Sequence, residues 1–193
     1  MIGWVLGFFV GVLILVLKAV GAVFYRFLLA HEYLHMVMAS RLGVAYRDRG
    51  HQGSHYIVEM RNPTPGQLAL ISFAPICLAV VAVASFLVFW SIVEVHFWFS
   101  LLFLFVGVGC ARFSPPSFVD VSGVFLNVSR AQPLSSVLSS VVALPLLILR
   151  LPCLLFPRHN LYLDWLFVAL LFYGSFVLEN WVRASLVFPP GVY

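Results

Sequence analysis

Residues 29–37 read Leu29-Ala30-His31-Glu32-Tyr33-Leu34-His35-Met36-Val37, which places a His-Glu-x-x-His motif inside an apolar run. Residues four apart lie about one turn apart on one face of a helix, so His31 and His35 would present both imidazoles to the same side. Glu32 lies nearly on that face. Two neutral imidazoles that hold Zn²⁺, with a carboxylate beside them that takes a proton from water on the metal, are the parts of a zinc hydrolase. The stretch therefore predicts a zinc site with Glu32 as the catalytic base and acid.

The composition around this motif is that of a membrane protein. The chain has 193 residues, of which 63% are hydrophobic and only 9% charged, and its mean hydropathy is +1.05. A soluble globular domain carries roughly 25% charged residues. We therefore expect a single membrane-embedded domain over residues 1–193, in contact with the lipid bilayer. The net charge of +4 is not gathered in a basic cluster, so it fits charged cytoplasmic loops and predicts no nucleic-acid partner.

The apolar runs predict an all-α polytopic fold with five to six transmembrane helices, since a helix needs about 20 apolar residues to cross a bilayer. Residues 2–42 can be two segments with a tight turn at 18–21, or one helix about 60 Å long, twice the hydrocarbon thickness. We prefer two segments. The further spans are expected at 67–90, 95–111, 134–156 with a kink at its prolines, and 161–182. The catalytic core would occupy about residues 20–128, and the C-terminal helices 134–185.

The most polar part of the chain, residues 44–65, predicts a small β-hairpin after the motif helix. Residues 44–48 and 55–60 would form the strands, with a turn at 50–53. Tyr56, Val58 and Met60 alternate and would share one face. Because an extended peptide can add to the edge of such a strand, we expect these three residues to bind substrate.

Zinc needs a third protein ligand and an open fourth position for water. We choose Asp120, which follows Pro115-Pro116 at the start of a predicted helix, on the membrane side where His35 lies if most arginines face the cytoplasm. Ser117 to Asp120 also fits a helix-capping sequence. Glu179 is the runner-up, and it can instead pair with Arg183. The other candidates, all of them His, Asp or Glu, are His51, His55, Glu94, His96 and Asp164.

Three of these features together resemble the site-2-protease type of intramembrane zinc metalloprotease and the small prokaryotic membrane peptidases related to it. They are the His31–His35 motif in a membrane helix, a strand-forming loop after it, and the element Pro116-x-x-x-Asp120. The resemblance covers about residues 20–128. It implies a Zn²⁺ cofactor held by His31, His35 and Asp120, with Glu32 as general base.

The same resemblance implies an intramembrane endopeptidase of a prokaryotic plasma membrane that cleaves membrane-associated proteins or peptides. The loop charges place its active site toward the cytoplasmic half of the membrane. The alternative is a membrane protein that binds metal for structure or transport without catalysis, and a weaker one is a scaffold in which the motif is accidental. The sequence predicts neither the substrate, the cleavage site, the pathway nor the oligomeric state.

Overall fold

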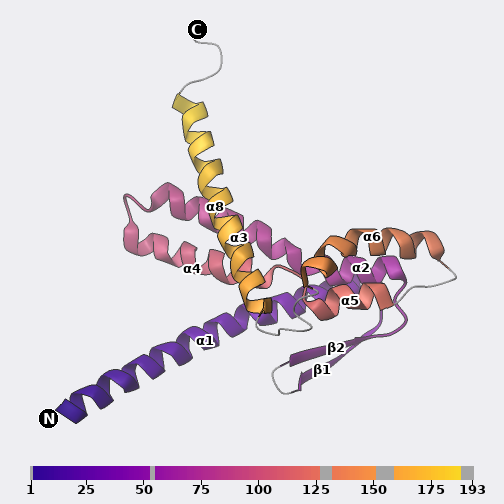
Figure 1. The fold of residues 1–193 in the computed structure, drawn as a ribbon, viewed down its shortest axis with the longest axis horizontal. Coiled ribbons are helices and arrows are strands. Elements are labelled where there is room, and N and C mark those ends of the chain that lie inside the picture. The colour runs from indigo at the N-terminus through magenta and orange to yellow at the C-terminus, as the bar shows by residue number, and fades with distance from the viewer. Residues whose placement is uncertain (1, 53–54, 127–131, 151–158, 188–193) are drawn as a thin grey trace, which may run out of the picture.

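The computed structural model (Figure 1) describes residues 2–52, 55–126, 132–150 and 159–187, and these residues are mostly helical. Three of the described helical stretches are long and apolar enough to cross a membrane: Phe9–Arg41, Pro65–Ile92 and Leu161–Leu186. Two shorter apolar helices, Phe97–Arg112 and Pro133–Pro145, accompany them. The chain is therefore a mainly helical protein with three candidate membrane spans. The larger number of five to six spans stays a prediction.

The motif lies on one long helix, α1 (Ile2–Arg41). The preferred division of this region into two segments is therefore wrong. The chain has no proline between Ile2 and Arg41, and a glycine such as Gly21 costs a helix only about 1 kcal/mol relative to alanine, which does not stop it. The helix ends where expected: Gly43 adopts a φ of 68°, the left-handed conformation that closes a helix C-terminus.

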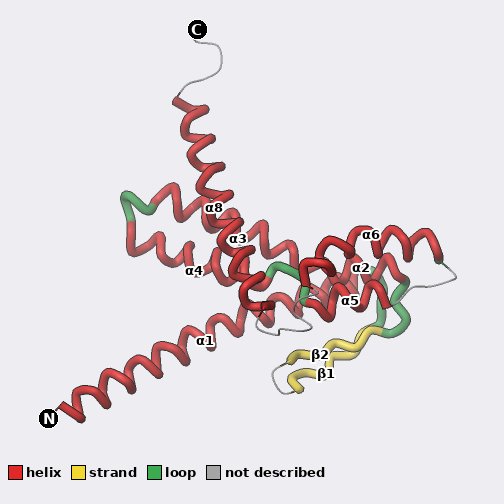
Figure 2. Tube along the Cα trace, viewed as in Figure 1, coloured by secondary structure: helices red, strands yellow, loops and turns green. Residues whose placement is uncertain are grey.

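Two strands follow α1, as Figure 2 shows: β1 (Tyr46–Gln52) and β2 (His55–Met60). They pair antiparallel, with Tyr46 opposite Met60 and an irregularity between Asp48 and Gly50. The strand begins later than predicted and continues through the positions expected to turn, because a local bulge accommodates the glycine within the strand. Residues 53–54, the rest of the predicted turn, lie outside the described residues.

The next apolar run is divided at a proline. Helix α2 (Pro65–Phe73) starts at a capping box formed by Thr64 and Gln67. A single 3₁₀ turn, η1 (Ala74–Ile76), separates it from α3 (Cys77–Ile92). Pro75 lies in that turn, since proline lacks the N–H that an α-helix needs and crowds the preceding turn. The predicted span at 67–90 is thus a helix interrupted near its first third.

Close packing joins α3 to α4 (Phe97–Phe113) and α4 to α1. A Cβ atom added to Gly107 would meet the Phe86 ring at 2.4 Å, and one added to Gly109 would meet the Phe27 ring at 2.3 Å. The two glycines therefore let aromatic rings of α3 and α1 lie directly on the backbone of α4. The buried cluster around them includes Leu78, Ala82, Phe86, Cys110, Ala111 and Val168.

The remaining helices are α5 (Phe118–Leu126), α6 (Pro133–Arg150) with Pro145 inside it, and α8 (His159–Val187). Helices α5 and α6 pack with α2, while α8 packs with α3 and α4. Figure 1 shows these as two groups, with the C-terminal part of α1 reaching both. Pro152, where a second kink was expected, lies outside the described residues. The motif turn of α1 thus lies where the two groups of helices meet.

Candidate metal centre

His31 and His35 are buried on the face of α1 that looks into the protein, with exposed fractions of 6% and 4%. Each ring is fixed by a backbone carbonyl. Nδ1 of His31 lies 2.6 Å from the carbonyl oxygen of Phe113, and Nδ1 of His35 lies 2.7 Å from that of Ile71. Because a carbonyl oxygen only accepts, each Nδ1 carries the hydrogen and donates it. In the neutral form of each ring, Nε2 therefore carries a lone pair.

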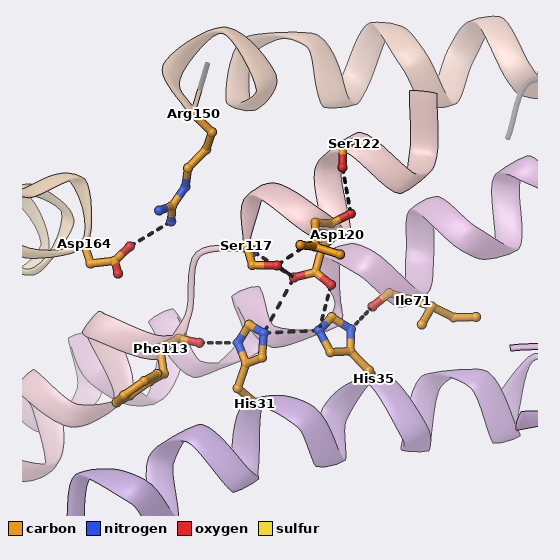
Figure 3. Close-up of polar contacts among 10 residues, drawn as sticks. His31, His35, Ile71, Phe113, Ser117, Asp120, Ser122, Arg150 and Asp164 are labelled. Atoms are coloured by element: carbon orange, nitrogen blue, oxygen red, sulfur yellow. Dashed lines mark hydrogen bonds and ion pairs between the residues drawn. The ribbon is translucent and has the colours of Figure 1, made fainter. Parts of the chain in front are cut away.

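These lone pairs converge with a carboxylate from a distant part of the chain (Figure 3). The two Nε2 atoms lie 3.2 Å apart. Asp120 Oδ2 lies 3.7 Å from Nε2 of His31, and Oδ1 lies 3.5 Å from Nε2 of His35. When both histidines are neutral, three electron-rich groups at this range repel one another. Either a proton on one histidine or a bound cation would relieve this repulsion.

The spacing fits zinc. Ligand atoms about 2.0–2.1 Å from Zn²⁺ in a tetrahedral site lie about 3.3 Å from one another. The two Nε2 atoms lie 3.2 Å apart, and they lie 3.7 and 3.5 Å from different oxygens of Asp120. One ligand atom from each residue lies within 4.8 Å of the others, so side-chain adjustments would bring the three to one ion. Two imidazoles and one carboxylate are also a donor set typical of catalytic zinc sites. Among the residues that the structure describes, these three form the one group of His, Cys, Asp or Glu side chains close enough to hold a metal ion.

Asp120 reaches the histidines because α5 is anchored on its other side. Val121 and Val124 are buried against Leu68 of α2 and Ala143 of α6. The turn before α5 contains Pro115 and Pro116, and Ser117 caps the helix by hydrogen bonds to Asp120. The apolar side of this short helix thus fixes the direction of the carboxylate.

Asp120 lies outside the three candidate spans, and its surroundings keep it ionised. Burial raises the pKa of its carboxyl. The contacts with His31 and His35 in their protonated forms and the hydrogen bond from Ser117 lower the pKa by more, so it lies below its ordinary value. An ionised carboxylate is the form that binds a metal.

Glu32 is half-buried and lies beside the ligands rather than among them. It lines an open hollow of about 430 Å³ on α1, together with Arg26, Leu29, Ala30, Tyr33 and Met36. The proposed base therefore borders a space that is open to the outside of the protein. Neither His31 nor His35 lines this hollow.

The other candidate ligands lie elsewhere. Glu179 accepts hydrogen bonds from Arg183 at 2.9 Å and from Ser91 at 3.0 Å, the pairing given above as the alternative to a ligand role. Asp164 is paired with Arg150 at 2.8 Å (Figure 3). Glu94 and His96 are exposed at the connection between α3 and α4. The side chains of His51 and His55 lie outside the described residues.

The predicted substrate-binding residues are only partly described. Met60 is half-buried and packs against two buried clusters that include Leu68, Ile71 and Val44. Tyr56 and Val58 lie in β2 by their backbone, and their side chains lie outside the described residues. The role of these three residues in binding substrate stays a prediction.

Three groups at the site were not predicted. Two are the backbone carbonyls of Phe113 and Ile71, which accept hydrogen bonds from the imidazoles. Every residue has such a carbonyl, so the sequence does not indicate which ones will lie beside the histidines. The third is Ser117, whose N–H and hydroxyl both donate to Asp120. Its capping pattern was visible in the sequence, and it could have been interpreted as support for the ligand as well as for the helix.

Comparisons with known proteins add no relative: no protein-family model matches the chain, and neither the curated proteins nor the solved structures contain a match.

Proposed function

We propose that this protein is a membrane-embedded, zinc-dependent endopeptidase that cleaves membrane-associated peptides or proteins. The observation that supports it most is the convergence of His31, His35 and Asp120 with both Nε2 lone pairs free. The neighbouring Glu32 adds a carboxylate at an open hollow. This is the donor set and the acid–base group that zinc-assisted peptide hydrolysis needs.

The ligand number favours hydrolysis over a purely structural metal site. Structural zinc sites are closed by four protein ligands, whereas catalytic sites have three and leave one position for water or substrate. The described residues provide three. Zinc, when bound, polarises the scissile carbonyl and makes water a stronger acid.

Glu32 would take the proton from the attacking water and pass it to the leaving nitrogen. Such positioned proton transfer accelerates a reaction by roughly 10²–10⁴-fold. The half-buried position of Glu32 at the open hollow supports this role, because substrate would arrive from that side.

A transmembrane substrate hides its carbonyl groups in helical hydrogen bonds, so it must unwind before it can be cleaved. The unwound segment would need a backbone partner. β2 pairs with β1 along one edge, and we propose that its other edge, with Tyr56, Val58 and Met60, holds the substrate.

The proposed topology has five to six spans, with the shorter helices α4 and α6 crossing or entering the membrane beside the three long spans. The metal ligands then lie toward the cytoplasmic half of a prokaryotic plasma membrane. Arg41 at the end of α1 and Arg112 at the end of α4 support this orientation, because basic residues concentrate at the cytoplasmic side.

The test compares wild-type protein with Glu32→Gln in lipid vesicles that contain a set of transmembrane peptides, with cleavage followed by mass spectrometry. We expect the variant to bind zinc like the wild type and to cleave at least about 100-fold more slowly. Equal cleavage rates would contradict the mechanism. Bound zinc without any cleavage, and four protein donors at the metal, would favour a non-catalytic metal protein instead.

A further inference from the structure

Ser117 makes an unusually complete set of contacts with one carboxylate oxygen (Figure 3). Its backbone N–H donates to Asp120 Oδ2 at 2.7 Å, and its hydroxyl donates to the same oxygen at 2.6 Å. The backbone N–H of Asp120 lies 3.2 Å from the Ser117 hydroxyl oxygen and donates back to it. Two donors of Ser117, at the start of the helix, therefore fix the position of Oδ2.

The other oxygen, Oδ1, faces His35. It lies 3.5 Å from Nε2 of that residue, and no hydrogen bond to it is recorded among the described residues. The two oxygens of Asp120 thus have different surroundings: Oδ2 accepts two hydrogen bonds from Ser117 and lies 3.7 Å from Nε2 of His31, whereas Oδ1 lies near His35 without these donors. A carboxylate with one oxygen already saturated binds a metal through the other.

We infer that Ser117 is a positioning residue of the metal centre, which holds Asp120 so that it binds zinc through Oδ1 alone. The inference rests on the metal site of the proposed function and adds to it a residue and a binding mode. Single-oxygen binding by Asp120 keeps the number of protein donor atoms at three. Ser117 would therefore help to preserve the fourth position for water.

A purely structural explanation is that Ser117 only caps α5. The two explanations make different predictions for Ser117→Gly. Glycine caps a helix start nearly as well as serine but has no hydroxyl. The variant therefore removes the hydroxyl donor to Oδ2 of Asp120 and keeps the helix and the backbone N–H donor. Ser117→Thr retains the hydroxyl and tests for rescue.

A matched control is Ser122→Ala. Ser122 lies on the same helix, and its hydroxyl donates to the carbonyl oxygen of Val119 at 3.1 Å rather than to Asp120. It removes a hydroxyl from α5 without touching the carboxylate.

The experiment measures the dissociation constants of Zn²⁺ and Co²⁺ for the full-length purified chain and its variants, the visible spectrum of the Co²⁺ forms, and the thermal unfolding of the metal-free forms. Loss of a group that orients a metal ligand typically weakens binding 10–100-fold. We expect that loss for Ser117→Gly, near-normal binding for Ser117→Thr and Ser122→Ala, and similar unfolding of all metal-free forms. The cobalt absorption of Ser117→Gly should weaken, because Oδ2 keeps only the backbone N–H as a donor and can then also bind the metal, which raises the coordination number.

Wild-type metal affinity and spectrum in Ser117→Gly would overturn the inference and leave the proposed function standing. Weakened binding that appears equally in Ser122→Ala, or that follows a loss of metal-free stability, would also overturn it. If the wild-type chain itself binds neither metal, the proposed function fails first.

Discussion

At the scale of single residues, the informative detail is which nitrogen of each histidine carries its hydrogen. The carbonyls of Phe113 and Ile71 fix Nδ1 of His31 and His35 as donors. The two Nε2 atoms then face each other and a carboxylate. A structural His–Asp cluster in which a histidine is protonated has the same contacts, so only metal binding distinguishes a ligand set from it.

The substitution Asp120→Asn tests whether the proposed third ligand binds zinc. An amide is a far weaker zinc ligand than a carboxylate, so we expect zinc affinity to fall by more than the roughly 10–100-fold typical of an outer partner. Isothermal titration or competition with a chelator measures it. Glu94→Gln removes an exposed carboxylate far from the ligand set in sequence and should leave the affinity unchanged. Equal affinity in wild type and Asp120→Asn would remove this residue from the site.

The sequence predicted the residues that converge but not what holds them. The four-residue spacing of His31 and His35 sets their common face, and the proline-terminated turn before Asp120 suggested its direction. The structure brings these three residues together, while zinc binding itself stays a prediction. The carbonyls of Phe113 and Ile71 could not be foreseen, because they depend on how α4 and α2 pack on α1.

At the scale of elements, the position of the site depends on how closely α4 lies on α1. Gly109 allows the Phe27 ring to lie against the backbone of α4. The ring has little room to move, because it packs with Phe24 and Phe105, each with its centroid 6.1 Å from that of Phe27. Phe113, whose carbonyl holds His31, lies one turn further along α4. Separation of the two helices would therefore move the Phe113 carbonyl away from His31 and disturb the candidate metal centre.

Gly109→Ala should destabilise the protein by about 1–3 kcal/mol, the usual cost of forcing an extra carbon into a packed interface. Gly174→Ala is the matched control, since Gly174 lies within α8 and an added Cβ meets nothing within 4 Å. It should be neutral or slightly stabilising, because alanine favours a helix over glycine. Thermal unfolding in detergent gives the comparison. A stable Gly109→Ala variant would show that α1 and α4 are less tightly packed than described.

The sequence predicted where apolar helices lie better than where they begin and break. Composition and length located the regions of α3, α4 and α8, since these properties are local. The prediction of two segments in place of α1 was wrong. One continuous helix exceeds the thickness of a bilayer, so a turn at residues 18–21 gave segments that matched the membrane better. The interruption at Pro75 and the start of β1 depend on contacts with residues distant in the chain, which the sequence alone does not reveal.

At the scale of the whole molecule, the N-terminal part of α1 and the C-terminal part of α8 project from the packed helices (Figure 1). The apolar residues of α1 before the motif, including Phe9, Leu13 and Leu17, are exposed. Within a bilayer, lipid covers such a surface. His31 and His35, the proposed ligands on this helix, lie on the other part of α1, where the helix meets the rest of the protein.

The orientation can be tested by labelling a single cysteine. In a chain whose native cysteines are replaced by alanine, Ser40→Cys places an exposed thiol next to Arg41 at the end of α1. We expect a membrane-impermeant maleimide to label it only from the cytoplasmic side, as the distribution of basic residues predicts. Labelling from the opposite side would reverse the proposed topology.

The central claim is that His31, His35 and Asp120 hold zinc. Zinc-edge X-ray absorption of the purified chain, with the metal content measured on the same sample, tests it most directly. The account predicts one zinc per chain, with two imidazole nitrogens and two oxygens at about 2.0–2.2 Å, and loss of that zinc in His31→Ala. A wild-type chain without zinc, or zinc that persists in His31→Ala with an unchanged spectrum, would contradict it.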